Sequence, residues 1–255
     1  MINRRILLRL AAVSAACAAM PGIAEERHLP RLIERARKFD SIGERIAFIS
    51  RAYLGRPYVA NSLIGSATEP ERFVVREDAF DCVTYCETVL AAARARTMKA
   101  FKAELRKIRY RQGEVDWYAR NHYFIDWSID NIANGVCRAV VLPGAEKVAK
   151  TLTFMHQPGA RSVTFMCNSR AAVFAHSDLL ATGDIAGFVS HRPALDFHHT
   201  GFIIVQRDGA LWLRHASLSQ GRVLEQPLPQ FCDINGVRLL TLLRPQEVMA
   251  GDPVV

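Results

Sequence analysis

The stretch FDCVTYCETVLAAA, residues 80–93, predicts a helix that opens with a cysteine. Asp81 is a good helix N-cap, because its carboxylate accepts hydrogen bonds from unpaired backbone N–H groups. Cys82 then lies in the first turn, where those N–H groups and the helix dipole stabilise a negative charge and lower the pKa of a thiol. Cys82 is therefore a candidate nucleophile. The alternative is that it is a small buried residue or one half of a disulfide. The helix assignment rests on apolar residues at near-helical spacing, which are Val83, Cys86, Val89, Leu90 and Ala93.

Residues 1–24 have the pattern of an export signal that is removed from the mature protein. A basic segment precedes an Ala-rich apolar run, Leu10–Met20, that is too short to span a bilayer. Small residues at Gly22 and Ala24 favour cleavage before Glu25. The basic segment contains Arg4, Arg5 and Arg9.

The segment Asn3–Arg9 also resembles a twin-arginine signal, which would imply export of the folded protein. A lipid anchor on Cys17 is disfavoured, because Ser14 stands where a lipoprotein signal has a branched apolar residue. The later apolar segments are short and interrupted by charges. We therefore expect an exported, periplasmic protein without a stable membrane anchor.

The length of the remaining chain, residues 25–255, suits a single domain. The formal charge is +8, and removing the three signal arginines leaves +5, because no acidic residue precedes Glu25. Lys and Arg are spread along the chain without a basic tract, which argues against a nucleic-acid partner. A mildly basic exported protein suits an anionic cell wall or membrane surface.

The mature chain keeps an odd number of cysteines, so at least one is unpaired in an oxidising compartment. One free nucleophile and up to two disulfides would account for them, with the pairing left open. Cys82 and Cys86 are too close in an unbroken helix to be a natural disulfide pair. Metal is not expected, since no second cysteine pair has metal-finger spacing. The five cysteines are Cys82, Cys86, Cys137, Cys167 and Cys232.

Helical periodicity precedes a C-terminal third of short apolar runs separated by turn signals. Helices followed by an antiparallel sheet predict an α+β fold. The expected helices are 29–39, 42–54, 82–96 and 98–108, and the expected strands are 185–189, 201–205, 211–213 and 237–243.

Two histidines flank a predicted hairpin. His199 precedes the strand 201–205, and His215 follows the strand 211–213. A turn at Asp208-Gly209 pairs these strands antiparallel, so the start of one lies beside the end of the other. We therefore expect His199 and His215 to lie close together. If this edge packs against the start of the Cys82 helix, a Cys-His-His arrangement results.

Four segments carry a resemblance to a known family: 54–60, 78–84, 118–127, and 183–185 together with the 199–217 hairpin. Together they resemble the NlpC-type superfamily of papain-like cell-wall hydrolases. Within it they resemble the N-acetylmuramoyl-L-alanine amidase-like branch, formerly catalogued as a domain of unknown function. The resemblance spans about residues 45–245. It implies a papain-like α+β fold in which N-terminal helices and a cysteine-bearing helix pack on a C-terminal antiparallel sheet.

The resemblance also implies roles for individual residues. Cys82 would be the nucleophile, His199 the general base and His215 the residue that orients His199. Tyr58 stands where the superfamily has a tyrosine near the nucleophile that supports the oxyanion or the cysteine. The implied substrate is a peptidoglycan fragment, a muropeptide, cut between N-acetylmuramic or 1,6-anhydromuramic acid and L-alanine. No metal or organic cofactor is implied.

Several residues near these motifs have two interpretations. Arg120, His122 and Tyr123 could line a sugar-peptide groove, Arg120 suiting a peptide carboxylate, although the aromatic residues also form a helical core stripe. Cys86 falls on the buried side of its helix. His198 is a second candidate base, but adjacent strand residues face opposite sides, and the match to the family favours His199.

Other functions compatible with these residues are kept open. The first is an endopeptidase that cuts the γ-D-glutamyl–diaminopimelate bond, an activity of the wider superfamily. A thiol acyltransferase acting on lipid would use the same Cys-His-His chemistry. A non-catalytic peptidoglycan-binding protein would not need Cys82, and a redox protein would need both Cys82 and Cys86.

Overall fold

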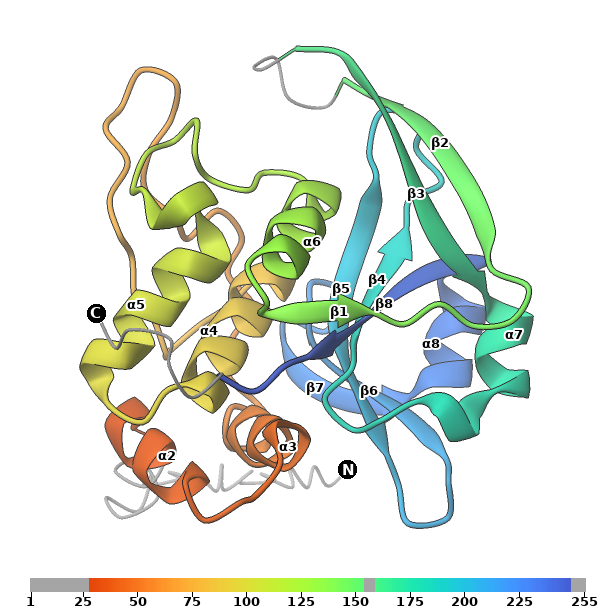
Figure 1. Ribbon diagram of the computed structural model, residues 1–255, viewed down its shortest axis with the longest axis horizontal. Helices are drawn as coiled ribbons and strands as arrows, with labels where there is room; N and C mark the ends of the chain where they lie inside the picture. The colour runs from red at the N-terminus through yellow and green to blue at the C-terminus, as the bar shows by residue number, and fades with distance from the viewer. Residues whose placement is uncertain (1–27, 154–158, 249–255) are drawn as a thin grey trace, which may run out of the picture.

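An eight-stranded antiparallel sheet with helices on both faces is the centre of the computed structural model (Figure 1). The structure describes residues 28–153 and 159–248. The predicted α+β fold is confirmed: helices come first, and most of the sheet comes from the C-terminal half. The predicted export signal, residues 1–24, lies outside the described residues.

The sheet has the strand order β2-β3-β8-β4-β5-β6-β7, and β1 also pairs with β8. The four expected strands correspond to β4, β5, β6 and β8. The β2–β3 hairpin at one edge is not among the expected strands, and many of its side chains are exposed. The strands are β1 (Cys137–Ala139), β2 (Glu146–Leu152), β3 (Arg161–Ser169), β4 (Ile185–Val189), β5 (Phe197–Val205), β6 (Leu211–Ser217), β7 (Arg222–Pro227) and β8 (Leu239–Pro245).

Helices α2 to α6 gather on one side of the sheet, and α7 and α8 lie on the other (Figure 1). No helix in the described ranges is long and apolar enough to cross a bilayer. The helices are α2 (Leu29–Ala36), α3 (Ile42–Ala52), α4 (Cys82–Arg94), α5 (Met98–Arg109), α6 (Phe124–Ala133), α7 (Arg170–Ala175) and α8 (Leu228–Ile234), with 3-10 turns η1 (Arg111–Gly113) and η2 (Ser177–Leu179).

Helix α4 is the central helix of the first side. From Thr84 to Arg94 every one of its residues is buried, because α2, α3, α5 and the sheet surround it. Its apolar residues belong to one core cluster with the inner faces of α2, α3 and α5. The cysteine at its N-terminus is therefore carried by the most enclosed helix of the fold.

Strand β5 contributes alternate side chains to two separate cores. Phe202 belongs to the core on the α4 side, where its ring lies 5.8 Å from that of Tyr85. Ile203 belongs to the second core, which includes Phe231 of α8. By the same alternation Thr200 faces α4, and His199 faces α8.

The two predicted hairpin strands are longer than expected. β5 and β6 extend to include His199 and His215, which the sequence analysis placed just outside the strands. Polar residues at these positions interrupt the apolar pattern, although they are paired inside the sheet. The turn at Asp208-Gly209 is confirmed: Gln206 N–H donates to the Ala210 carbonyl at 2.9 Å, and Gly209 has the positive φ of +82° that this turn requires.

None of the cysteines after residue 27 forms a disulfide in the structure. Cys82 is partly exposed, and the thiols of Cys86, Cys137, Cys167 and Cys232 are free and buried. The two disulfides that the cysteine count allows are therefore not present among the described residues.

Candidate active site

Asp81 caps the cysteine-bearing helix as the sequence predicts. Its Oδ1 accepts from the N–H groups of Val83 at 3.0 Å and Thr84 at 2.8 Å, and Thr84 Oγ1 accepts from the Asp81 N–H at 3.0 Å. Cys82 is the first residue of α4. No oxygen of the described residues accepts from the Cys82 N–H, so this donor is open to a developing oxyanion.

The Cys82 thiol is not a thiolate at neutral pH. Burial, followed by the Asp81 carboxylate, raises the pKa of the thiol to about 12. The backbone N–H groups of Thr200, Cys82 and Val83 oppose this shift but are outweighed. The expectation that the helix start lowers this pKa is therefore wrong for the ligand-free protein, because the cost of desolvating the charge exceeds the gain from the helix N-terminus.

His199 and His215 form a hydrogen-bonded pair, as the hairpin predicts. Nε2 of His199 lies 2.6 Å from Nδ1 of His215, and the rings are nearly perpendicular at 86°. Gly201 permits this approach, since a Cβ there would lie 2.8 Å from the Cβ of His215. Phe231 of α8 covers both rings at centroid distances of 5.4 and 5.3 Å.

Both imidazoles are neutral at physiological pH. Burial lowers the pKa of His215, which is 1% exposed, to about 4. Burial and then the proximity of His215 and His198 lower the pKa of His199 well below its usual value. A neutral His199 can accept a proton, as a general base must.

Cys82 lies beside β5 at Thr200, the residue after His199. The described pairing of β5 with β6 begins at Phe202 and Arg214, and the side chains of His199 and His215 stay in hydrogen-bond contact beyond it. The Cys82 sulfur lies on the α4 side of β5, where the N–H of Thr200 faces it, whereas the His199 ring packs against Phe231 of α8. Within the described chain no hydrogen bond joins the thiol to the His199 ring.

Gln226 of β7 is a member of this site that the sequence analysis missed. Its Nε2 lies 2.9 Å from Nε2 of His215. Gln226 pairs with Leu213 in the register of β6 and β7, so it lies diagonally beside His215. Side chains alternate between the two faces of a strand, so a strand at 222–227 would have placed Leu224 and Gln226 on one face. No strand is among those predicted for these residues.

Tyr58 lies near Cys82, where the family resemblance puts it. An isolated bridge joins Tyr58 to Phe80, next to the cap of α4. Burial, followed by the proximity of Cys82 and Asp81, raises the pKa of the Tyr58 phenol to about 12. The phenol therefore keeps its proton and is a hydrogen-bond donor beside the sulfur.

His198 and Cys86 are separate from the histidine pair. His198 sits at a bulge between β4 and β5 and is exposed, with its Nδ1 3.3 Å from the Val189 carbonyl oxygen. Cys86 is buried on the inner side of α4, where its Sγ lies 3.9 Å from Oγ1 of Thr200. Burial raises the pKa of Cys86 well above that of a free thiol, so Cys86 is a protonated core residue.

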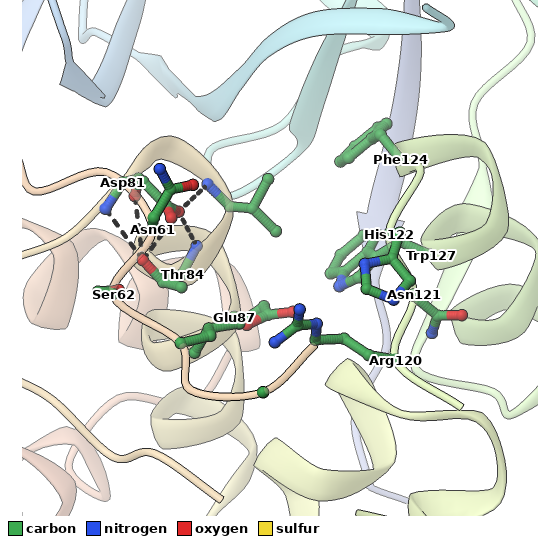
Figure 2. Close-up of a pocket in the computed structure, with 13 residues that line it drawn as sticks. Asn61, Ser62, Asp81, Thr84, Glu87, Arg120, Asn121, His122, Phe124 and Trp127 are labelled. Atoms are coloured by element: carbon green, nitrogen blue, oxygen red, sulfur yellow. Dashed lines mark hydrogen bonds between the residues drawn. The ribbon is translucent and has the colours of Figure 1, made fainter. Parts of the chain in front are cut away.

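A cavity of about 440 Å³ opens beside the N-terminal half of α4. Figure 2 shows Asp81, Thr84 and Glu87 on one wall, and Arg120, His122 and Trp127 opposite them. The loop that contains Asn61 and Ser62 forms a further wall. The cavity shares Asp81 and Val83 with the start of α4, so a molecule bound in it lies next to Cys82.

Arg120 brings positive charge to this cavity, as predicted. Its Nη1 donates to Oε1 of Glu71 at 3.1 Å, and its charge also reaches Glu87. In Figure 2 the guanidinium extends between the two walls toward Glu87. The same Glu71 oxygen also accepts from the Tyr110 hydroxyl at 2.8 Å.

The aromatic residues of the 118–127 segment are divided between cavity and core. His122 lines the cavity, and its Nε2 lies 2.7 Å from the Trp117 carbonyl oxygen. Trp127 lines it as well, although it is 1% exposed. Tyr123 is 2% exposed and lines a second cavity of about 240 Å³, where the Arg161 guanidinium lies over its ring.

Comparisons with known proteins agree with this arrangement. The model of the N-acetylmuramoyl-L-alanine amidase-like family matches residues 48–236. A crystal structure of an N-acetylmuramoyl-L-alanine amidase from Bacteroides uniformis is 25% identical, with a TM-score of 0.70, and the match covers 82% of this chain and 100% of that chain. A second crystal structure so named from the same organism is 26% identical, with a TM-score of 0.69, over 81% and 99% of the two chains.

The fold also occurs at lower sequence identity. A Legionella pneumophila protein is 21% identical, with a TM-score of 0.74, and the match covers 89% of this chain and 97% of that chain. No curated protein sequence matches the chain significantly.

Proposed function

The chain belongs to the N-acetylmuramoyl-L-alanine amidase-like family, and from this membership we propose that it hydrolyses the amide between N-acetylmuramic or 1,6-anhydromuramic acid and L-alanine. The proposed nucleophile is Cys82, the general base is His199, and His215 orients His199. The observation that carries the proposal is the 2.6 Å hydrogen bond between the two histidines, one of which is next in sequence to Thr200, whose N–H faces the Cys82 sulfur.

The ring nitrogens of His199 have different tasks in the proposed reaction. Nε2 faces His215, so Nδ1 is the nitrogen left to take the thiol proton. The proton leaves Sγ as the sulfur attacks the amide carbonyl carbon, so no standing thiolate is needed. The short contact between thiol and imidazole forms when substrate binds, since catalytic hydrogen bonds commonly tighten only in the substrate complex.

The proposed reaction balances through one thioester. The carbonyl oxygen becomes an oxyanion, stabilised by the open Cys82 N–H and the Tyr58 hydroxyl. The carbon–nitrogen bond then breaks, and protonated His199 gives its proton to the alanine nitrogen. Water, deprotonated by His199, attacks the thioester, and the lactyl carboxylate leaves as Sγ regains a proton.

The cavity beside α4 is proposed to hold the stem peptide. Arg120 lines this cavity, and planar guanidinium groups pair with carboxylates through two parallel bonds. We propose that Arg120 binds a carboxylate of the peptide, with His122 shaping the same wall. Exchange of Arg120 for Gln should raise KM roughly tenfold with little change in kcat, since an interaction equal in ground and transition states affects binding alone. The control is Arg111→Gln, because the Arg111 side chain binds the Tyr118 carbonyl outside this cavity.

Export to the periplasm is part of the proposal, because that is where peptidoglycan lies. It rests on the basic and apolar pattern of residues 1–24. N-terminal sequencing of the protein from a periplasmic extract should begin at Glu25. A protein that stays in the cytoplasm with residues 1–24 attached contradicts it.

A muropeptide digest tests the activity. The wild-type protein should release an intact stem peptide and a free sugar, detected by mass, and Cys82→Ala should release neither. A shortened stem in the wild-type digest would instead identify a γ-D-glutamyl–diaminopimelate endopeptidase. A Cys82→Ala protein with full hydrolysis would overturn the cysteine mechanism, and Cys86→Ala is the matched control that should remain active.

A further inference from the structure

Three polar side chains form a hydrogen-bonded line across neighbouring strands. His199 lies on β5, His215 on β6 and Gln226 on β7. The two links are 2.6 Å, from His199 Nε2 to His215 Nδ1, and 2.9 Å, from His215 Nε2 to the Gln226 amide. Since both nitrogens of His215 are engaged, a change at one end of this line is transmitted to the other.

The line links the position of the His199 proton to the Gln226 amide. A neutral imidazole has one N–H and one bare nitrogen. For Nδ1 of His199 to accept the thiol proton, the ring N–H must be on Nε2 and must donate to Nδ1 of His215. The N–H of His215 is then on Nε2, where it needs an acceptor. Within the described chain, Gln226 is the side chain at that position.

Only one orientation of the Gln226 amide supplies that acceptor. In the structure the amide nitrogen faces His215 Nε2, and an amide nitrogen donates. That orientation puts the His215 proton on Nδ1 and the His199 proton on Nδ1, which blocks the base. A half-turn of the amide presents the oxygen instead and reverses both tautomers.

We propose that Gln226 is a positioning residue whose amide orientation, relayed by His215, decides which nitrogen of His199 carries the proton. An amide nitrogen facing His215 corresponds to a resting arrangement, and an amide oxygen facing it corresponds to the competent one. This inference rests on the proposed role of His199 as the base.

The charge next to Gln226 on β7 lies on the opposite face of the sheet. The carboxylate of the neighbouring Glu225 is held by Arg214, Nε to Oε2 at 2.6 Å. Arg214 in turn binds Ser50 of α3, so this ion pair lies on the α4 side of the sheet. Phe231 covers the two imidazole rings. Among the histidines, His198 contributes a further charge effect on His199.

Two substitutions separate the acceptor from the shape of the side chain. Gln226→Met keeps the volume but removes the hydrogen bond, and it should lower kcat on the order of tenfold with KM unchanged. Gln226→Glu supplies an acceptor without a donor, so kcat should stay within about threefold of wild type. Its carboxylate stabilises the imidazolium, so the acid limb of the kcat–pH profile should move to higher pH.

Nitrogen-15 NMR of histidine-labelled protein reads the tautomers directly. The signals of His199 and His215 are assigned from their single substitutions. Gln226→Glu should enrich the Nε2–H form of both rings, and Gln226→Met should shift both tautomer populations away from wild type. Gln206→Met is the control, because the Gln206 amide contacts Glu225 at the far end of β5, and it should change neither kcat nor these signals.

Three outcomes overturn the proposal. One is a Gln226→Met protein with wild-type kcat, pH profile and tautomers. Another is a Gln226→Glu protein that loses as much activity as Gln226→Met while both remain folded by thermal melting. If Gln226→Met does not fold, Gln226→Glu with unchanged tautomers overturns it alone. Because the NMR signals need no substrate, an absence of muropeptide hydrolysis would reject the proposed function and leave this test intact.

Discussion

Arg109 and Glu87 form a fully buried ion pair beneath the cavity. Arg109 Nε donates to Glu87 Oε2 at 2.7 Å, and each side chain is only 3% exposed. Arg109 Nη1 also donates to the Val74 carbonyl at 2.7 Å. The pair joins the helix that begins with Cys82 to the end of α5, and the Val74 bond adds the segment that precedes α4.

Breaking this pair should destabilise the protein strongly. Glu87→Gln keeps the shape but leaves the Arg109 charge buried and uncompensated, so the free energy of unfolding should fall by about 3–5 kcal/mol. Asp78→Asn breaks the exposed pair with Arg76 and should cost at most about 1 kcal/mol. Urea denaturation of both variants measures the difference, and equal losses would contradict the buried-pair argument.

Alkylation of Cys82 should be slow at neutral pH. A pKa of about 12 leaves roughly one thiol in 10⁵ ionised at pH 7, since each pH unit below the pKa reduces the thiolate tenfold. The iodoacetamide rate should therefore rise about tenfold for each pH unit between pH 7 and 9. Cys82→Ala identifies the reacting site by mass. Fast alkylation at pH 7 would mean that the thiol is ionised in the free protein.

The sequence predicts what depends on local signals. Asp81 caps α4 because the hydrogen bonds of the cap involve residues within three positions of it. The proximity of His199 and His215 follows from one turn, at Asp208-Gly209, and antiparallel pairing. The α+β order of elements follows from the change in periodicity along the chain.

The sequence does not predict what depends on distant packing. The pKa of Cys82 is set by burial at the edge of β5, far along the chain from α4. The β2–β3 hairpin has charged residues on its exposed side and weak alternation, so no strand pattern stands out there. Gln226 joins the histidine pair only because β7 lies beside β6.

Acid should weaken the fold between about pH 6.5 and 4. The folded pKa of His215, about 4, is below its usual value of 6.5, so the unfolded chain binds the proton first as the pH falls. The stability that neutral His215 contributes is complete above pH 6.5, and its loss reaches about 3 kcal/mol near pH 4. His215→Asn should flatten the dependence of unfolding free energy on pH, measured by urea titrations between pH 7 and 4. If the free energy of unfolding fell equally with pH in His215→Asn and in wild type, the burial of a neutral His215 ring would be contradicted.

Gly201→Ala should damage catalysis more than its loss of stability explains. The new Cβ would lie 2.8 Å from the Cβ of His215 and 3.0 Å from the Arg214 carbonyl oxygen, so β6 must shift at a cost of about 1–3 kcal/mol. Movement of His215 lengthens its bond to His199, and kcat should fall about tenfold or more. Gly209→Ala is the matched control, because Gly209 lies at the far end of the hairpin from the histidines. An alanine there meets no neighbouring atom, but the positive φ of +82° should lower the free energy of unfolding by about 1–2 kcal/mol. Comparable losses of stability with kcat reduced only in Gly201→Ala would support the role of Gly201. Equal kcat in the two variants would show that the close approach at Gly201 does not position the histidine pair.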